Sequence, residues 1–230
     1  MLNPVSTDVW NELTLNYLKK IASPSTDVVV RNIKEGPKVI ESEYDREYAA
    51  HHVVNEAVRA DKEGFDAIII NCFDDPGLNA AREVCNTLVL GIGETSIITA
   101  LLLGYRVAII STGLNAKLLY YRRAIELGVE KRVVYTGGID IGVLDLRRDE
   151  EKVLKLLINE GGKAVTAYGA DVIVLGCGGF IGMASRLSEE LGVPVVDPTE
   201  TTFKVAESLA QLGIKHSKKF LFNRLSYGYP

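Results

Sequence analysis

The sequence alternates short apolar runs with longer segments of helical spacing along its whole length. The apolar runs are rich in Val and Ile and apolar at successive positions, as strands buried on both faces of a parallel sheet must be. Strands are predicted at 27–30, 67–70, 87–92, 106–111, 132–136, 172–176 and 193–197. Between them, helical spacing is clearest at 43–63, 114–127, 149–160 and 199–212. This alternation predicts an α/β fold with right-handed crossovers.

An internal repeat restricts the fold further. The stretch GFDAIIINC (64–72) matches GADVIVLGC (169–177) at an offset of 105 residues. The same offset carries Ser6-Thr7 onto Ser111-Thr112 and VVV (28–30) onto VVY (133–135), and at one residue more LGIGET (90–95) falls on VDPTET (196–201). We therefore expect two similar flavodoxin-like α/β lobes with parallel sheets, related by duplication and by pseudo-two-fold symmetry.

The repeat also predicts where the chain divides and where a ligand binds. The first lobe is expected to comprise residues 1–98 plus 208–230, and the second lobe residues 99–207. In open α/β sheets, ligands bind outside the carboxyl ends of the strands. The active site is therefore expected in the cleft between the two lobes.

Composition excludes several classes of partner. The net charge of −4 over 230 residues argues against a nucleic-acid partner, which would favour a basic face. The sequence has no apolar stretch of about 18 residues, so no membrane span is expected. Its first residues lack a charged segment followed by an apolar one, so no signal peptide is expected. We therefore expect a cytoplasmic protein, in which the three cysteines remain thiols.

Two of the cysteines, Cys72 and Cys177, occupy the same place in the repeat, just past the end of an apolar run. A single cysteine at such a place is most often a small packed hydrophobe. The repeat favours a functional interpretation, because both thiols would point into one cleft from opposite sides. Each cysteine is followed by turn residues and then a helix, whose dipole would lower the thiol pKa from about 8.5 toward neutrality.

Two opposed thiols suit the inversion of a carbon stereocentre. A base removes the proton from one face of the carbon and an acid returns a proton to the other, and a thiol/thiolate pair can do both near neutral pH. With the carbon between them, the sulfur atoms would lie on the order of 7 Å apart, too far for a disulfide bond. Backbone N–H groups of the turns, among them those at Gly178 and Gly179, would stabilise the charge that develops on an adjacent carbonyl.

Several motifs give the chain a family resemblance: Asn3-Pro4, NCFDDPG (71–77), VLGIGE (89–94), GCGG (176–179) and GVPVVD (192–197). With these the chain resembles the cofactor-independent Asp/Glu/hydantoin racemase superfamily, and its hydantoin racemase branch in particular. The resemblance implies that Cys72 and Cys177 are the acid/base residues and that neither pyridoxal phosphate nor a metal is needed. The implied substrate is a small molecule, a 5-substituted hydantoin or a related amino-acid derivative. We also expect a homo-oligomer, with the basic and aromatic segment 215–230 packed on the chain or between subunits.

Further residues are candidates for substrate contacts. They are Asn3, Ser6, Thr7, Phe73, Asp74, Ser111, Thr112, Gly178 and Gly179. The four hydroxyl residues could instead cap the helices that follow them, and Asp74 could be a turn residue. Glu94 and Glu200 are expected at helix starts, where a negative charge is favourable.

Other residues are expected to be structural. Cys85 is placed at a helix end that enters a strand, so we expect it to be packed. His51 and His52 have no matching ligand, which makes a metal site improbable.

Rival functions remain open. The stretch VIVLGCGGFIG, with Asp197 about 20 residues on, loosely matches a dinucleotide-binding pattern, but its spacing is irregular and the first half has no counterpart. A two-lobed binding protein would have similar architecture but no use for paired thiols. Amino-acid racemases, decarboxylases of malonate-like acids and maleate-type isomerases share the superfamily scaffold, and a single essential cysteine would indicate a decarboxylase.

Overall fold

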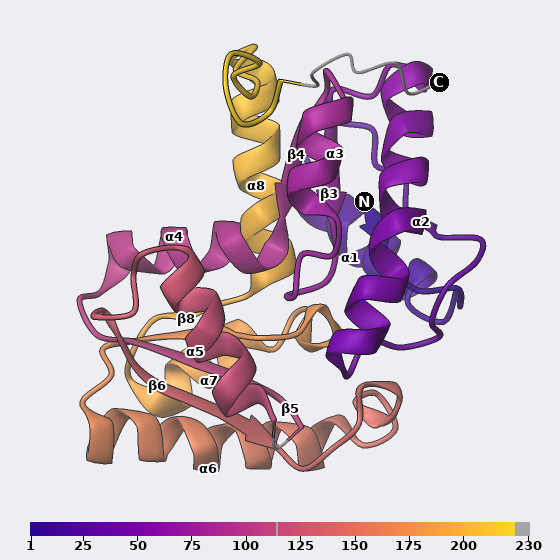
Figure 1. Ribbon diagram of the computed structural model, residues 1–230. Helices are drawn as coiled ribbons and strands as arrows, with labels where there is room; N and C mark the ends of the chain where they lie inside the picture. Colours follow the sequence, from indigo (N-terminus) through magenta and orange to yellow (C-terminus); the bar gives the residue numbers. More distant parts are fainter. Residues whose placement is uncertain (114, 224–230) are drawn as a thin grey trace. The chain divides into compact units, whose positions relative to one another are not determined.

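A computed structural model of the chain describes residues 1–113 and 115–223 (Figure 1). The chain divides into two compact units, which we call lobe 1 (Met1–Gly91 with the segment from Phe203 onward) and lobe 2 (Ile92–Thr202). Within the described residues, no helix is both long and apolar enough to cross a membrane.

Lobe 1 contains a parallel sheet of four strands in the order β2-β1-β3-β4. The strands are β1 (Leu2–Asn3), β2 (Arg31–Asn32), β3 (Ala67–Ile70) and β4 (Leu88–Gly91). The helices that lie wholly in lobe 1 are α1 (Asn11–Ile21), α2 (Glu43–Glu63) and α3 (Leu78–Val84).

Lobe 2 has the same strand order, β6-β5-β7-β8, in its own parallel sheet. The strands are β5 (Val107–Thr112), β6 (Val133–Ile139), β7 (Val172–Leu175) and β8 (Val195–Val196). The helices are α4 (Ile92–Leu103), α5 (Ala116–Glu126), α6 (Glu150–Tyr168) and α7 (Ala184–Leu191), with short 3-10 helices η1 (Val143–Asp145) and η2 (Gly178–Phe180).

The two lobes repeat one topology, which confirms the predicted pair of α/β lobes with parallel sheets. The offset of 105 residues seen in the sequence carries β3 onto β7 and α1 onto α5 with the same bounds. In each lobe the first strand lies in the middle, hydrogen-bonded to the second strand on one side and the third on the other. The crevice next to such a central strand, where the chain order reverses, is where this class of sheet binds ligands.

Two helices connect the lobes, and each follows the last strand of one lobe but belongs wholly or largely to the other. Helix α4 follows strand β4 of lobe 1 but packs on strand β7 of lobe 2. Helix α8 (Pro198–Gln211) follows strand β8 of lobe 2, and from Phe203 onward it belongs to lobe 1. There the Lys204 ammonium donates to the carbonyl of Ile21 at the end of α1. The predicted divisions after residues 98 and 207 fall inside these two helices.

The long helices have clear caps. The Ser42 hydroxyl accepts from the Asp45 N–H at the start of α2, which ends at Gly64 with φ 83°, so the predicted range 43–63 is confirmed. Helix α6 continues to Tyr168, beyond the predicted range 149–160. The glycine pair after residue 160 does not end the helix. At Gly161 a Cβ atom would lie 2.5 Å from Leu191 Cδ1, so this glycine allows close packing of α6 on α7.

One strand prediction was wrong. Residues 27–30 have no strand structure, and β2 consists of Arg31 and Asn32. The central strand β1, Leu2–Asn3, had not been predicted, because two residues are too few to show any periodicity. The two strands pair in register, Leu2 with Arg31 and Asn3 with Asn32.

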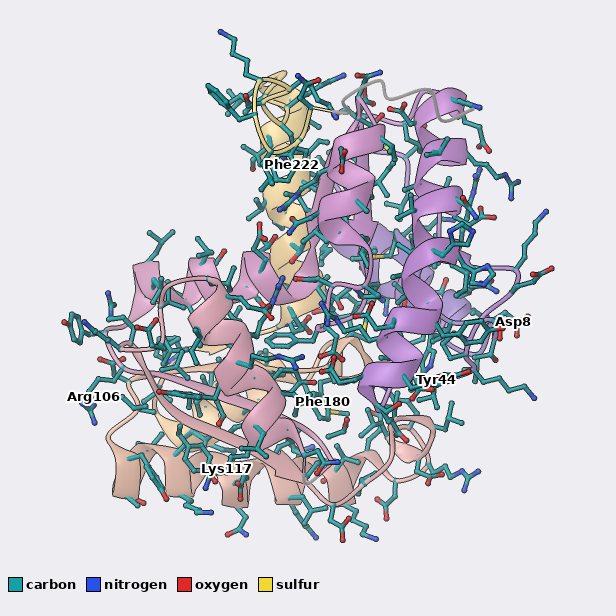
Figure 2. All side chains as sticks on the ribbon, viewed as in Figure 1. Asp8, Tyr44, Arg106, Lys117, Phe180 and Phe222 are labelled. Atoms are coloured by element: carbon teal, nitrogen blue, oxygen red, sulfur yellow. The ribbon has the colours of Figure 1, made fainter. Side chains whose placement is uncertain are left out.

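The segment 216–222 covers the outer edge of the lobe 1 sheet. The Nε2 atom of His216 lies 2.9 Å from the Val89 N–H and 2.8 Å from the Val89 carbonyl in edge strand β4, so it accepts from the first or donates to the second according to its tautomer. The Lys218 ammonium contacts the carbonyls of Arg82 and Cys85 at the end of α3, where a cation is favoured. The Phe222 ring, labelled in Figure 2, lies 5.7 Å from the Arg82 guanidinium. These contacts protect an edge that would otherwise be open to pairing. Residues 224–230 of the predicted C-terminal contact lie outside the described residues.

Glu207 on α8 provides a test of how this helix is held in lobe 1. Burial alone would raise the pKa of its carboxyl, but hydrogen bonds from Lys204, the Ser23 N–H and Thr26 outweigh it and lower the pKa from 4.5 to about 2. Because the folded pKa is lowered, the stabilisation is present above pH 4.5 and is lost as the pH falls toward 2. We expect Glu207→Gln to lower the free energy of unfolding by about 2 kcal/mol at pH 7.

Urea unfolding at pH 7 and pH 3 measures this effect. The difference between Glu207→Gln and the parent should shrink to below about 1 kcal/mol at pH 3, since the carboxyl of the unfolded chain is then protonated while the folded carboxyl is still mostly ionised. Glu12→Gln, at an exposed position of α1, is the matched control and should stay within about 0.5 kcal/mol of the parent. An equal loss at both pH values would contradict the role assigned to the carboxylate charge.

Candidate active site

Cys72 and Cys177 lie at equivalent places in their own sheets. Cys72 comes two residues after the end of β3, and Cys177 two residues after the end of β7. Each of these strands pairs with the central strand of its lobe, so each cysteine lies at the carboxyl end of a sheet, next to the point where the strand order reverses. Both cysteines are thiols that form no disulfide, and both are partly exposed. The predicted position of each thiol in its lobe is therefore confirmed.

The backbone after Cys177 is arranged to favour a thiolate. Cys177 is the N-cap of η2, and the Gly179 N–H donates to its Sγ atom at 3.4 Å. A donor at sulfur stabilises the ionised form more than the neutral thiol. The Phe180 side chain, labelled in Figure 2, is fully buried and anchors this turn. Gly178 and Gly179 remain candidates for substrate contacts, but the Gly179 N–H already donates to Cys177 Sγ.

The turn after Cys72 has a different construction. The Asp75 N–H donates to the Cys72 carbonyl at 3.0 Å, and helix α3 begins only at Leu78. Asp75 is buried and has a positive φ of 46°, which is rare for a residue other than glycine. Its carboxylate packs on Gly91 at the end of β4, where a Cβ atom would lie 2.2 Å from Asp75 Oδ1. The turn is thus fixed against the sheet by a side chain.

Phe73 and Asp74, two predicted substrate contacts, belong to this same turn. The Phe73 side chain is 2% exposed and packs in the interior. The Asp74 carbonyl accepts from Arg46 Nε on α2 at 3.3 Å. Helix α2 therefore also holds the backbone of the turn. Direct contact of either residue with a substrate stays a prediction.

A chain of side-chain amides crosses the carboxyl edge of the lobe 1 sheet. Asn71 Nδ2 donates to Asn3 Oδ1 at 2.7 Å, and Asn3 Nδ2 donates to Asn11 Oδ1 at 2.8 Å. Asn11 Nδ2 in turn donates to Asn32 Oδ1 at 3.0 Å. We call these four residues the asparagine relay. Only Asn3 had been singled out from the sequence, although an asparagine at or just after the end of three neighbouring strands was a usable signal.

The hydroxyl residues predicted as substrate contacts differ in their surroundings. The Ser6 hydroxyl donates to the Gly36 carbonyl at 2.9 Å, and Thr7 Oγ1 accepts from the Val9 N–H at 3.5 Å. Ser111 is fully buried, and its hydroxyl donates to the Gly176 carbonyl at 2.5 Å, directly before Cys177.

The alternative role of these hydroxyls, as helix caps, is wrong. The N-caps of α1 and α5 are Trp10 and Asn115, and neither helix has a side-chain cap. Thr112 ends strand β5 and is half-buried. Substrate contact by the four hydroxyls stays a prediction.

Asp197 holds the loop that follows Cys177. Its carboxylate is 3% exposed and accepts from the N–H groups of Gly182 at 2.7 Å, Thr199 at 2.9 Å and Glu200 at 3.1 Å. Burial raises the pKa of this carboxyl to about 6 despite the three donors. Because this carboxylate is buried and already accepts three backbone N–H groups, it is not accessible to a ribose hydroxyl. This argues against the dinucleotide-binding interpretation. Glu200, as predicted, lies in the first turn of α8 and Glu94 in the first turn of α4.

Cys85 is structural, as predicted. It is the C-cap of α3, its side chain is fully buried in the lobe 1 core, and no strand end presents it to a ligand. Burial, assisted by the negative charge of Asp61 and opposed by Lys218, raises the pKa of this thiol to about 11. At neutral pH the Cys85 thiol is therefore almost entirely protonated and unreactive.

The three thiols are consequently expected to react unequally. In the folded protein at pH 8, iodoacetamide should label Cys72 and Cys177 but not Cys85, whose thiolate fraction is about one in a thousand. Peptide mass spectrometry should find two modified cysteines in the native protein and three in urea. Labelling of Cys85 in the folded protein as fast as either of the others would contradict the assignment.

Comparison with known proteins shows the family to which the chain belongs. The family model for Asp/Glu/hydantoin racemase matches residues 1–206. A hydantoin racemase of Pseudomonas sp. (strain NS671) is 37% identical over 230 residues, covering 100% of this chain and 90% of the relative. A hydantoin racemase of Paenarthrobacter aurescens is 34% identical, covering 95% of this chain and 93% of the relative. The crystal structure of allantoin racemase from Pseudomonas fluorescens has a TM-score of 0.93 at 27% identity, covering 100% of this chain and 97% of that one. The chain therefore belongs to the Asp/Glu/hydantoin racemase family, and it is an isomerase of the racemase class.

Proposed function

We propose that this protein interconverts the enantiomers of a 5-substituted hydantoin, or of a closely related amino-acid derivative. Of Cys72 and Cys177, one removes the proton from the stereogenic carbon and the other donates a proton to its opposite face. The observation that carries the proposal is the equivalent placement of two partly exposed thiols, each at the switch point of one of two like sheets. Relatives at 34% and 37% identity are named hydantoin racemases, which supports the substrate class.

The proposed reaction needs one thiolate and one thiol. The thiolate takes the proton from the stereogenic carbon, and the electron pair left behind spreads into the neighbouring ring carbonyl. The second thiol then gives its proton to the opposite face, and the carbon is inverted. After one turnover the first sulfur carries the proton and the second is a thiolate, so the protein is in the correct state for the other enantiomer. Exchange with solvent restores the starting state.

Residues of this chain provide the charge stabilisation that each step requires. The Gly179 N–H supports negative charge on Cys177 Sγ when that sulfur is the base. The polarised carbonyl of a carbanion intermediate needs fixed N–H donors, because a preorganised donor costs no reorganisation at the moment of reaction. The turns after Cys72 and Cys177 are held by Asp75 and Asp197, so their N–H groups are fixed in advance.

The test is the loss of optical activity of a single-enantiomer 5-substituted hydantoin in heavy water, followed by circular dichroism and mass spectrometry. The parent should racemise the substrate and exchange the hydrogen at the stereogenic carbon. Cys72→Ser and Cys177→Ser should each lower racemisation by about 1,000-fold, the range of a lost acid/base group. Cys85→Ala is the matched control and should retain the parent rate, since Cys85 lies in the core.

Isotope exchange distinguishes a mechanism with two acid/base thiols from a mechanism with one. Each serine variant retains one base, so it should still exchange hydrogen for deuterium in one enantiomer, without inversion, and Cys72→Ser and Cys177→Ser should choose opposite enantiomers. Full racemisation by either variant would end the two-thiol proposal. If a malonate-like acid lost carbon dioxide with only one cysteine required, the protein would be a decarboxylase instead.

A further inference from the structure

We propose that Asn11 and Asn32 are positioning residues for Cys72, which act on it through Asn3 and Asn71. The inference deepens the proposed function and rests on it in one respect, namely that Cys72 is taken as an acid/base group. The structural part of the inference concerns lobe 1 alone.

The asparagine relay has a single direction. Each amide donates its NH2 group to the carbonyl oxygen of the next, from Asn71 to Asn3, Asn11 and Asn32, and Asn32 Nδ2 ends the chain at the Ile33 carbonyl, 3.1 Å away. Hydrogen bonds in series polarise one another. Asn3, in the middle, is 2% exposed, so a broken link would leave a buried amide unpaired at a cost of about 1–3 kcal/mol. The relay is therefore expected to hold as a unit.

Asn71, the first donor of the relay, directly precedes Cys72. The Asn71 N–H donates to the Leu2 carbonyl at 2.8 Å, and its side chain donates to Asn3 at 2.7 Å. Both the backbone and the side chain of Asn71 are thus tied to strand β1. Cys72 is the next residue, so the peptide that carries the thiol is fixed by the same two bonds. A displacement of about 1 Å at a reacting group can cost about a hundredfold in rate.

Lobe 2 has no equivalent of the relay. The offset of 105 residues that carries α1 onto α5 and β3 onto β7 places Ala116 at Asn11 and Gly176 at Asn71. Strand pairing gives the other two equivalents. Leu2 pairs with Ile70 as Ile110 pairs with Leu175, so Ser111 stands at the place of Asn3, and Gly138, which pairs with Ser111, stands at the place of Asn32. Three of the four replacements lack a polar side chain, and the fourth, Ser111, donates to the Gly176 carbonyl and not to a side-chain amide. The relay is therefore specific to the thiol of lobe 1 and is not a requirement of the repeated fold.

This asymmetry has a defined kinetic consequence. The enantiomers have equal free energies, so any racemase must have the same kcat/KM in both directions. Loss of the relay must therefore lower kcat/KM equally for the two enantiomers. It can still change kcat and KM by different factors for each, because only one of the two thiols loses its support. A general loss of folded protein would lower both kcat values alike and leave both KM values unchanged.

The experiment breaks the relay in its middle. Asn11→Leu removes both the acceptor for Asn3 and the donor to Asn32, whereas Asn11→Asp keeps the acceptor for Asn3 and so preserves the half of the relay that leads to Cys72. Asn55→Leu, at an exposed position of α2, is the matched control. Rates of iodoacetamide labelling at Cys72 and Cys177 are measured peptide by peptide, together with kcat and KM for each enantiomer and the melting temperature.

We expect Asn11→Leu to change the labelling rate of Cys72 by about fivefold or more, with Cys177 within about twofold, and to lower kcat/KM about tenfold or more for both enantiomers. Asn11→Asp should stay within about threefold of the parent, and Asn55→Leu should match it. If Asn11→Leu does not fold, Asn32→Ala gives the same readouts at a half-buried site. A lowered melting temperature with unchanged Cys72 labelling and unchanged kinetics would overturn the inference. Because labelling does not require racemisation, failure of the proposed function would show in the parent alone.

Discussion

The structure depends on one constraint, the parallel pairing of the first strand of each lobe with the second strand on one side and the third strand on the other. In lobe 1 this strand is only Leu2–Asn3, yet it pairs with both β2 and β3. In lobe 2 the equivalent strand β5 is six residues long and pairs with β6 and β7. The pairing fixes where the third strand of each lobe ends, and hence where each thiol lies. A shift of one residue in either sheet would turn every side chain to the other face.

The two lobes achieve the same placement of a thiol by different means. In lobe 1 the residue before Cys72 is held by side-chain amides, and the turn after it by the Asp75 carboxylate against Gly91. In lobe 2 the residue before Cys177 is a glycine that is held by the buried Ser111 hydroxyl, and the loop after it by the Asp197 carboxylate. Buried polar groups of this kind are costly unless every one is satisfied. Each set therefore restricts its turn to one conformation, which is what a proton-transfer group requires.

Much of the fold could be predicted because its signals are local. The apolar runs that became β3 and β7, the capped helix at 43–63 and the 105-residue offset all depend on residues close in sequence. The same is true of the equivalence of Cys72 and Cys177. Strand β1 could not be predicted, because two residues carry no periodicity and its pairing depends on partners far along the chain. Helix α6 extends beyond the predicted range 149–160, and the close contact of Gly161 with Leu191 within it joins residues that are far apart in the sequence. Of the amides that support Cys72, only Asn3 was recognised, since the links to Asn11 and Asn32 exist only after the strands pair.

The combination of like frameworks and unlike supports fits the chemistry proposed for this chain. Enantiomers differ only in the arrangement around one carbon, so the groups that exchange the proton should be equivalent, and a duplicated fold provides two equivalent positions. The other groups of the substrate are not altered by the reaction. A ureide ring has distinct carbonyl and N–H groups, and a protein that binds it needs different polar groups at its two sides. Duplication followed by divergence at positions such as Asn71 and Gly176 satisfies both demands, because it alters the polar surroundings of each thiol without moving the strand that carries it.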